Sequence, residues 1–243
     1  MDYKKLFYSD AVQHTANYIC EIARECWTLQ LNDSTGFSIT SRIGDTDAII
    51  VDKSGTGFRR NIITPEDLIL IDVNGNLLFK PENSENPRLA PVNVVIQLEG
   101  YKACDKLGGG IHWHDPWTNA FAAKGLTIEP FTLQSKLLGD VQCAIVDDRK
   151  EKKYMKDNNI DVKVPTGLHS RPDVYYVMKQ AGEKSAKFIK ERTDELDKHG
   201  IVVTHFEHGL TAWGRSVEEA FDNAYRSVRN AQASLFTKLL EIE

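Results

Sequence analysis

Apolar residues recur at helical spacing in four long stretches of the chain. In the first stretch, hydrophobic side chains follow one another at intervals of three and four residues, and Ser9 or Asp10 can cap the start of the helix. In the last stretch, Ser216 and Glu219 have the spacing of a capping box. The pattern predicts long helices over residues 9–30, 93–106, 173–198 and 217–241.

Short apolar or alternating runs between these helices predict β-strands. Asn74-Gly75 lies between two such runs and is a strong signal for a hairpin. Asp115-Pro116 is a typical helix start, with Asp as the N-cap and Pro at the first helical position. The expected strands are 37–43, 47–52, 68–73, 76–79, 126–130, 141–147 and 201–206, with a further strand that begins at Gly108–Gly110 and ends near His114. The expected short helices are 116–124 and 132–138.

Three polar stretches interrupt the pattern. Residues 53–57 contain two glycines and are interpreted as a plain turn or a weak anion-binding loop. Residues 80–88 form a proline-containing loop, a plausible place for functional groups. Residues 148–163 are highly charged, which predicts a solvated surface segment.

The composition narrows the class of protein. With 243 residues and 41% hydrophobic residues, the chain can bury a substantial core, and we expect residues 1–243 to form one domain. The net charge is -5 and no Lys/Arg run stands out, so nucleic acid and membranes are not expected partners. The N-terminus is polar and the four cysteines form no CxxC pair, which indicates a cytoplasmic protein with reduced, mostly buried thiols.

The stretch Ile111-His112-Trp113-His114 carries the strongest chemical signal. His112 and His114 stand two residues apart at the expected end of a strand, and a strand projects such side chains from one face. His208 follows another expected strand, and Gly209 after it allows close backbone approach or positive φ. We therefore predict a metal site formed by three histidines.

Three neutral imidazoles suit zinc above all, with iron, manganese and cobalt as alternatives, and leave coordination positions open for a substrate. His205 lies three residues before His208, so on a regular strand it would point to the opposite face. We therefore leave His205 out of the expected ligand set.

Several segments occur in an order that resembles the class II aldolase/adducin family. The resemblance covers about residues 10–235, and each segment is weak alone, whereas the ordered set is specific. Its segments are Phe37-Ser38-Ile39-Thr40-Ser41-Arg42 for "GNIS-x-R", Ser54-Gly55 with Thr64-Pro65-Glu66-Asp67-Leu68 and Asp72-Val73-Asn74-Gly75 for "SG … TPEDL … D-x-x-G", His112-Trp113-His114 for "H-x-H", and His208-Gly209 with Val217-Glu218-Glu219-Ala220 for the family's ending.

This resemblance implies a three-layer α/β/α sandwich around a central, largely antiparallel sheet. It also implies a homo-oligomer, commonly a ring-like tetramer with its sites at subunit contacts. Enzymes of the family break or form carbon bonds next to a carbonyl in a small molecule. A divalent metal stabilises the enolate that forms, and a carboxylate usually moves the proton.

The chain departs from the family where that carboxylate is expected. If Tyr101 is the tyrosine of the family's "H-x-x-x-Y" segment, Gln97 replaces its histidine and Asn93 replaces its acid. Asn cannot accept a proton near neutral pH. This ungapped alignment, which we prefer, makes the adducin-like branch the closer neighbour. An alternative alignment with an eight-residue insertion uses Glu85, so the candidate catalytic residues are Asn93, Tyr101 and Glu85. Asp115 is a further candidate, although capping of its helix explains it more simply.

The family's phosphate-binding residues are also partly replaced. Ser38 stands for the Asn of "GNIS", and Pro91 and Val92 stand for the serines of its "PSSE" segment. A carboxylate, keto-acid or aromatic substrate is therefore more plausible than a phosphorylated sugar. The expected substrate-binding residues are Thr40, Arg42, Ser54, Gly55 and Trp113. Trp113 and its neighbour Trp117 could wall the pocket, although packing in the core explains both tryptophans more simply.

Three functions compete on this sequence. The first is a metal-dependent lyase, either an aldolase or a decarboxylase. The second is a non-heme iron oxygenase that uses the same three histidines. The third is a non-catalytic interaction domain like the head of adducin, against which an intact histidine triad argues.

Overall fold

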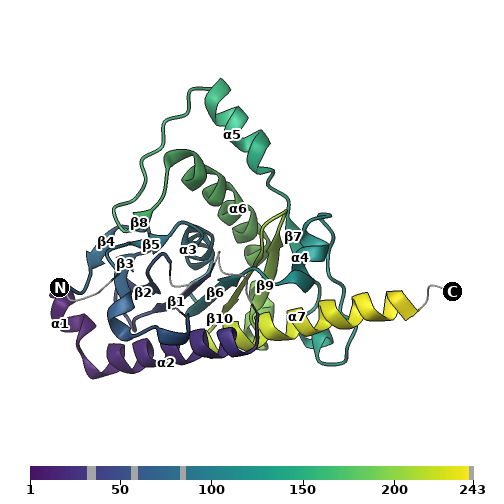
Figure 1. Cartoon of the computed structure of the whole chain (residues 1–243), viewed down its shortest axis with the longest axis horizontal. Coiled ribbons are helices and arrows are strands. Elements are labelled where there is room, and N and C mark those ends of the chain that lie inside the picture. The colour runs from purple at the N-terminus through teal and green to yellow at the C-terminus, as the bar shows by residue number, and fades with distance from the viewer. Residues whose placement is uncertain (32–36, 56–59, 83–85, 241–243) are drawn as a thin grey trace.

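An eight-stranded sheet forms the centre of the computed structural model, which describes residues 1–31, 37–55, 60–82 and 86–240 (Figure 1). Its strand order is β4-β3-β2-β1-β6-β10-β9-β7, and every neighbouring pair is antiparallel except β7 with β9. The strands are β1 (Ser38–Arg42), β2 (Ala48–Asp52), β3 (Leu68–Asp72), β4 (Leu77–Phe79), β6 (Gly109–Trp113), β7 (Gln142–Ala144), β9 (Ile201–His205) and β10 (Leu210–Gly214). β5 (Ala90–Pro91) and β8 (Leu168–His169) form a separate parallel pair.

Helices cover both faces of this sheet. In Figure 1, α2 (Asp10–Thr28) and α7 (Val217–Leu240) run along the lower edge, whereas α3 (Val94–Ala103) and α6 (Pro172–Glu191) lie above. The remaining elements are α1 (Tyr3–Phe7), α4 (Pro116–Ala122), α5 (Asp148–Asp157) and the 3-10 helices η2 (Arg60–Ile62), η3 (Pro65–Asp67), η4 (Ser135–Leu137) and η5 (Thr193–Asp197). The architecture is the expected α/β/α sandwich around a largely antiparallel sheet.

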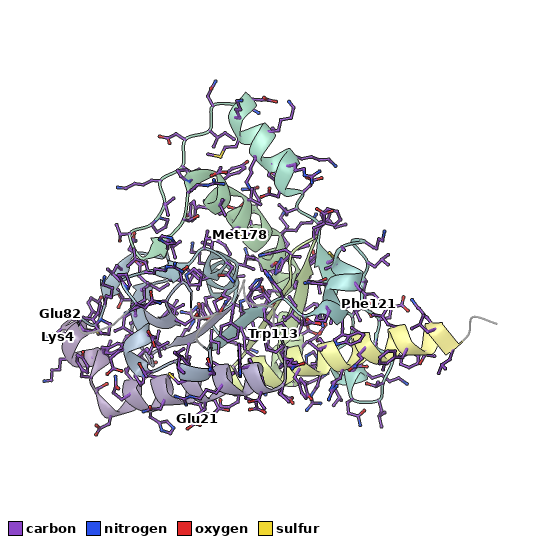
Figure 2. All side chains as sticks on the ribbon, viewed as in Figure 1. Lys4, Glu21, Glu82, Trp113, Phe121 and Met178 are labelled. Atoms are coloured by element: carbon purple, nitrogen blue, oxygen red, sulfur yellow. The ribbon has the colours of Figure 1, made fainter. Side chains whose placement is uncertain are left out.

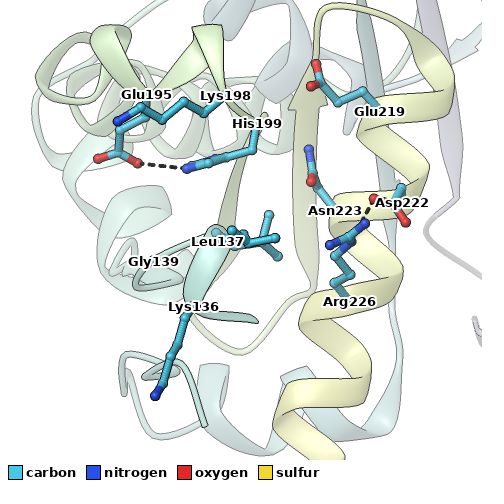
Figure 3. Close-up of a pocket in the computed structure, with 11 residues that line it drawn as sticks. Lys136, Leu137, Gly139, Glu195, Lys198, His199, Glu219, Asp222, Asn223 and Arg226 are labelled. Carbon is cyan, nitrogen blue, oxygen red and sulfur yellow. Dashed lines mark hydrogen bonds and ion pairs between the residues drawn. The ribbon is translucent and has the colours of Figure 1, made fainter. Parts of the chain in front are cut away.

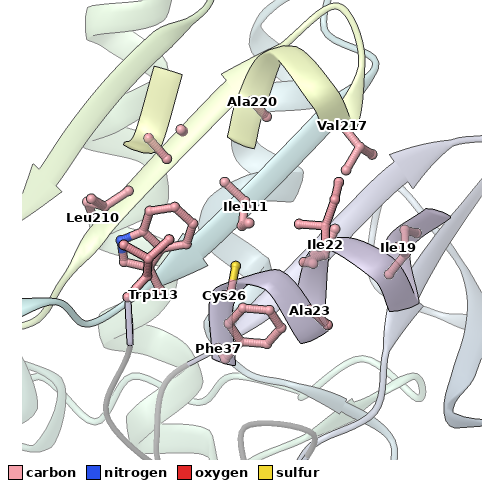
Figure 4. Close-up of a cluster of buried hydrophobic side chains, with 14 of the residues drawn as sticks. Ile19, Ile22, Ala23, Cys26, Phe37, Ile111, Trp113, Leu210, Val217 and Ala220 are labelled. Carbon is pink, nitrogen blue, oxygen red and sulfur yellow. The ribbon is translucent and has the colours of Figure 1, made fainter. Parts of the chain in front are cut away.

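The alternation of side chains along the strands divides the core into two clusters. Ile39, Ile111 and Ala212 pair across neighbouring strands and pack against α2 and α7. Figure 4 shows part of this cluster, with Trp113 near Leu210. The other face of the same strands packs against α3 and α6. The central strand β6 therefore carries core residues on one face and is free to carry polar residues on the other.

Strand β10 is absent from the sequence-based prediction. Residues 201–214 form a hairpin, in which β9 turns back into β10 after Glu207, whose φ is +53°. All five residues of β10 are buried, so the strand lacks the alternation of polar and apolar residues that would reveal it. His208 consequently lies in the turn of a hairpin and not on a strand.

The charged segment is exposed as expected, but it contains a helix that was not predicted. No residue of α5 is buried, and its Asp147 N-cap accepts hydrogen bonds from the backbone N–H groups of Arg149 and Lys150. Ion pairs one turn apart, such as Lys152 with Asp148, support the helix without a buried face.

Some predicted elements are shorter in the structure. The helix expected to reach residue 198 ends at Glu191 and continues as η5. The expected strand 126–130 is reduced to one bridge between Ile128 and Val141, and the helix expected over 132–138 is the single turn η4.

Several local predictions are confirmed. The Asn74-Gly75 turn joins β3 to β4, and Gly75 has the positive φ (+84°) that favours glycine. Asp115 caps α4 by accepting from the backbone N–H groups of Trp117 and Thr118. The four cysteines are buried, and none forms a disulfide within the described residues. Among the described residues, every helix is too short or too polar to span a bilayer.

Candidate metal centre

The three predicted histidines meet at one end of the central strands, which we call the histidine edge of the sheet. His112 is in β6, and its neighbours across the sheet are Ser38 in β1 and Thr211 in β10. His114 follows the end of β6, and His208 lies in the turn that precedes β10. Since β6 ends where β10 begins, the antiparallel pairing brings these residues to the same place from opposite directions along the chain.

The geometry of the cluster fits a metal ion. The potential ligand atoms of His112, His114 and His208 all lie within 4.8 Å of one another. His112 Nε2 is 3.2 Å from His114 Nε2. Two imidazole nitrogens bound to one tetrahedral zinc at roughly 2.0–2.1 Å lie about 3.3 Å apart, so this pair is close to a ligating arrangement. In the part of the chain that the structure describes, these three residues are the group of potential ligands that converges in this way.

Burial keeps the imidazoles of His112 and His208 in the form that binds metals. His112 is fully buried, and burial, followed by the like charge of the neighbouring histidines, lowers its pKa well below the usual value. The pKa of His208 is lowered for the same reasons. Both rings are neutral at neutral pH, and a neutral imidazole has a lone pair available for a metal.

A chain of hydrogen bonds orients His112 from behind. Its Nδ1 is 3.0 Å from Thr211 Oγ1, and the same hydroxyl is 2.8 Å from Nε2 of His205. A metal on Nε2 of His112 requires the proton on Nδ1, which then donates to Thr211. Partners of this kind fix the tautomer and orientation of a ligating histidine.

The position of His205 corrects the prediction that it points to the other face. Val203 pairs with Thr211, and His205, two residues further along β9, shares the face of Val203. The interval from His205 to His208 does not follow strand periodicity, because the chain reverses between them. His205 is 2% exposed, and burial lowers its pKa to about 3. It supports the cluster, although it is not among the three converging ligands.

Gly209 shows why the turn after His208 needs a glycine. A Cβ at this position would lie 2.5 Å from His114 Cδ2 and 2.5 Å from the carbonyl oxygen of Trp113. Its φ is outside the positive region, so of the two reasons expected from the sequence, close backbone approach is the one that applies.

Beside the histidines, one face of α3 forms a buried polar network with β1. Nε2 of Gln97 donates to Ser38 Oγ at 2.6 Å, and its Oε1 accepts from Thr40 Oγ1 at 2.5 Å. The hydroxyl of Tyr101 lies 2.8 Å from Thr40 Oγ1. A Cβ at Gly110 would be 2.9 Å from both Gln97 Oε1 and Thr40 Oγ1, so this glycine makes room for the network.

This network corrects two predicted site residues. Thr40 and Tyr101 are both fully buried, and their hydroxyl groups are occupied with each other and with Gln97. Burial raises the pKa of Tyr101, so it cannot lose its proton near neutral pH. Because Thr40 and Tyr101 are fully buried, they are not placed to contact a substrate directly. They support the buried network beside the histidines.

Two further predictions are corrected by strand geometry. Arg42 lies at the far end of β1 from Ser38, where its guanidinium donates to the carbonyl oxygens of Leu107 and Tyr101 and stacks over the Tyr101 ring. Trp113, labelled in Figure 2, is fully buried among the α2/α7 residues (Figure 4). Strand alternation places it on the opposite face from its neighbour His112. Arg42 therefore stabilises the fold, and Trp113 cannot wall a pocket at the histidines.

The remaining predicted residues lie at or near the histidine edge. Asn93 lies one helical turn before Gln97, which contacts both Thr40 and Ser38. α3 runs along β1 in this region, so Asn93 lies beyond Ser38, toward the histidines. It is 5% exposed, and neither polar atom of its side chain has a partner among the described residues. Ser54 and Gly55 follow β2 at the same edge, since the Asp52 side chain accepts from the N–H of Ile39. Glu85 lies outside the described residues.

Three residues near the site were not identified from the sequence. Because β10 and its hairpin were not recognised, His205 was assigned to the opposite face and Thr211 was missed. Arg88 packs over Gly55, whose added Cβ would lie 2.7 Å from Arg88 Nη1. Its place in the polar loop 80–88 was the available signal.

A larger cavity, of about 490 Å³, lies between α7 and η5, away from the histidine cluster. In that cavity His199 points to Glu195, and Arg226 pairs with Asp222 (Figure 3). Many of its charged groups are thus paired with one another, and none of the three converging histidines lines it.

The fold and the cluster define an α/β/α sandwich with a candidate metal centre at the edge of a mostly antiparallel sheet. The family model described as Class II Aldolase and Adducin N-terminal domain matches residues 17–235, so the chain belongs to the class II aldolase and adducin family.

Solved structures agree on the fold. L-fuculose-1-phosphate aldolase from Thermus thermophilus is 18% identical, with a TM-score of 0.64, over 92% of this chain and 93% of that chain. A sugar-phosphate aldolase from Thermotoga maritima is 13% identical, with a TM-score of 0.60, over 96% and 98%. An aldolase II superfamily protein from Pseudomonas syringae is 16% identical, with a TM-score of 0.62, over 96% and 78%.

Proposed function

We propose that this protein is a divalent-metal-dependent carbon–carbon lyase, of the aldolase or decarboxylase type. It acts next to a carbonyl group in a small, non-phosphorylated substrate such as a keto acid. The observation that carries the proposal is the convergence of His112, His114 and His208 within 4.8 Å. A purely structural domain has no physical need for three imidazoles that converge on one point.

The donor set favours zinc, with iron, manganese and cobalt as alternatives. A divalent ion in this place would polarise the carbonyl oxygen and stabilise the negative charge that develops there as the neighbouring carbon bond breaks. The protein contributes three ligands, so positions remain open for the substrate. Thr211 and His205 hold His112 in the tautomer that this role requires.

Asn93 takes the place of the acid in the alignment with the family, and its chemistry changes what this position can do. Its amide donates and accepts hydrogen bonds but cannot accept a proton near neutral pH. Since its side chain is buried without a partner among the described residues, we assign it the orientation of a bound substrate. Glu85 is the alternative carboxylate for proton transfer.

The proposed absence of a phosphate rests on the residues around Ser38. The Ser38 hydroxyl accepts from the Gln97 amide and is fully buried, so it offers no exposed surface to a phosphate. Ser54 and Gly55 remain at the edge, with the exposed guanidinium of Arg88 beside them. A guanidinium matches the planar geometry of a carboxylate, which fits a keto acid.

Metal analysis combined with proton exchange tests the proposal. Protein purified anaerobically is expected to contain about one zinc or manganese ion per chain. In deuterated water it should exchange the C3 protons of pyruvate, as observed by NMR. Because the ion stabilises the developing charge, chelation is expected to slow the exchange by at least about 100-fold, with recovery when the metal is restored.

Other outcomes would separate the competing functions. Iron as the resident ion, with oxygen uptake and no proton exchange, would instead support an oxygenase. Failure to bind zinc, manganese, cobalt or iron would contradict the lyase and favour an interaction domain.

We also propose that the chain forms a homo-oligomer, a tetramer by family resemblance. The C-terminal end of α7 projects from the body of the protein in Figure 1. It exposes apolar side chains, and the segment before β7 exposes others. These residues are Phe236, Leu239, Leu240, Leu133 and Leu137, and isolated monomers rarely leave such a group uncovered.

Replacing Phe236 with glutamate is expected to dissociate the oligomer, because the new charge would be buried at the contact. Light scattering should give about four times 27.4 kDa for the wild type and 27.4 kDa for the variant. Tyr154→Glu on α5, another exposed aromatic, is the matched control and should remain an oligomer. A monomeric wild type would overturn the proposal.

A further inference from the structure

A second cavity, of about 200 Å³, lies directly beside the histidine cluster. It is enclosed by the end of β7, the middle of α6 and the turn that follows β9. Its walls are largely apolar, and two histidine rings also face it. The residues that define its chemistry are Val146, Val177, Met178, Ala181, His205 and His208.

The hydrogen-bond chain behind His112 determines the protonation of His205. With Nε2 of His112 directed at the cluster, its Nδ1–H donates to Thr211 Oγ1. The Thr211 hydroxyl then has its own hydrogen available and donates it to Nε2 of His205. A neutral His205 that accepts on Nε2 must carry its proton on Nδ1.

That Nδ1–H group has no acceptor within the part of the chain that the structure describes. His205 is 2% exposed, and neither its Nδ1 nor Nδ1 of His208 has a partner among the described residues. A buried donor without an acceptor is costly, so an unsatisfied pair in one cavity indicates that something polar enters it.

The charges around the cavity limit what can enter. The described residues that line it include the carboxylates Asp148 and Glu207 and no lysine or arginine. A phosphate or carboxylate would lose its solvation there without gaining a cation. The volume suits a single ring, since a cavity of roughly 150 Å³ already holds benzene.

We propose that this cavity is a specificity pocket for an uncharged, mainly apolar substituent of about one ring that carries a hydrogen-bond-accepting oxygen. The apolar walls receive the ring, and His205 Nδ1–H donates to the oxygen. The inference rests on the proposed function in placing this substituent on a carbonyl compound bound at the three histidines. The pocket itself depends on its lining and on the hydrogen bond between Thr211 and His205, and it does not require a substrate at the three histidines.

The pocket can be tested without the metal. 4-Methylphenol has the ring and the oxygen but no carbonyl group. It is expected to bind the metal-free protein and to perturb the NMR signals of the Ala181 and Met178 methyl groups. Toluene should bind more weakly, by roughly threefold to tenfold, because it cannot accept the hydrogen bond. His205→Phe should remove this difference between the two probes.

The connection to the histidine site is tested by calorimetry on zinc-loaded protein. Phenylpyruvate is expected to bind at least about tenfold more tightly than pyruvate, because its ring is buried in the pocket. Ala181→Leu fills the pocket and should abolish this advantage while leaving the affinity for pyruvate unchanged. Ala186→Leu makes the same change on α6 away from the pocket and should behave as the wild type.

The outcomes distinguish the two proposals. If 4-methylphenol does not bind, or binds equally well to Ala181→Leu, the pocket assignment is overturned whatever the metal does. If 4-methylphenol binds but neither oxo acid does, the proposed keto-acid function fails and the pocket is not a substituent site for it. Pyruvate binding with no gain for phenylpyruvate overturns the connection alone.

Discussion

Replacing His114 with alanine is expected to lower the affinity of the protein for zinc by at least about 100-fold. Loss of a residue that only supports a ligand typically costs roughly 10- to 100-fold in affinity, and loss of a ligand should cost more. His114 is half-buried and lies after the end of β6, so its removal should disturb the core less than removal of the fully buried His112. Competition against a fluorescent zinc chelator measures the change.

His14→Ala provides the matched control for this substitution. His14 is exposed on α2 beside Arg42 and Gly108, at the opposite end of β1 from the converging histidines. Its removal should therefore leave zinc affinity unchanged. Circular dichroism of both variants should match that of the wild type. Equal zinc affinity in His114→Ala and the wild type would contradict the assignment of the metal centre.

Replacing Thr211 with valine is expected to lower zinc affinity by roughly 10- to 100-fold. Valine has nearly the same shape as threonine but cannot accept from His112 Nδ1 or donate to His205 Nε2. His112 would then lose the partner that holds its tautomer and orientation. The same chelator competition gives the magnitude, and the folded content should remain that of the wild type.

Thr204→Val is the control for this effect. Thr204 is equally buried and lies on the neighbouring strand β9, but its hydroxyl lies 3.4 Å from the Gln142 carbonyl oxygen and not against a histidine. Zinc affinity should be retained in this variant. If Thr211→Val also retained full affinity, the hydrogen-bond chain would have no part in metal binding.

The layers and most of the elements could be predicted because periodic burial is a local property. The amphipathic stretches that became α2 and α7 show this periodicity along a single helix. The Asn74-Gly75 turn between β3 and β4 is likewise a local signal. The His112–His114 spacing likewise places both rings on one side of the chain. The same rule places Trp113 on the other side, so the predicted tryptophan wall conflicted with strand alternation itself.

What the sequence could not show depends on which strands are neighbours. β10 is buried throughout and has no alternation, so the hairpin that carries His208 was hidden. Without β10 there was no Thr211 beside His112, and no reason to place His205 near the site. Arg42 was assigned to the site because it follows Thr40 closely in sequence. It instead lies at the end of β1 that points away from the histidines.

Trp113 links the candidate centre to the heat resistance of the whole molecule. Its ring is packed between the sheet and the helices on one side of β6, while the histidines on either side of it face the site. An ion held by these histidines would bind the folded chain and not the unfolded one, because unfolding around Trp113 also separates the three ligands. A free-ion concentration 100 times the dissociation constant adds about 2.7 kcal/mol to the unfolding free energy, or roughly 5–10 °C in the melting temperature. The supply of metal would therefore affect how long the protein stays folded as well as its chemistry.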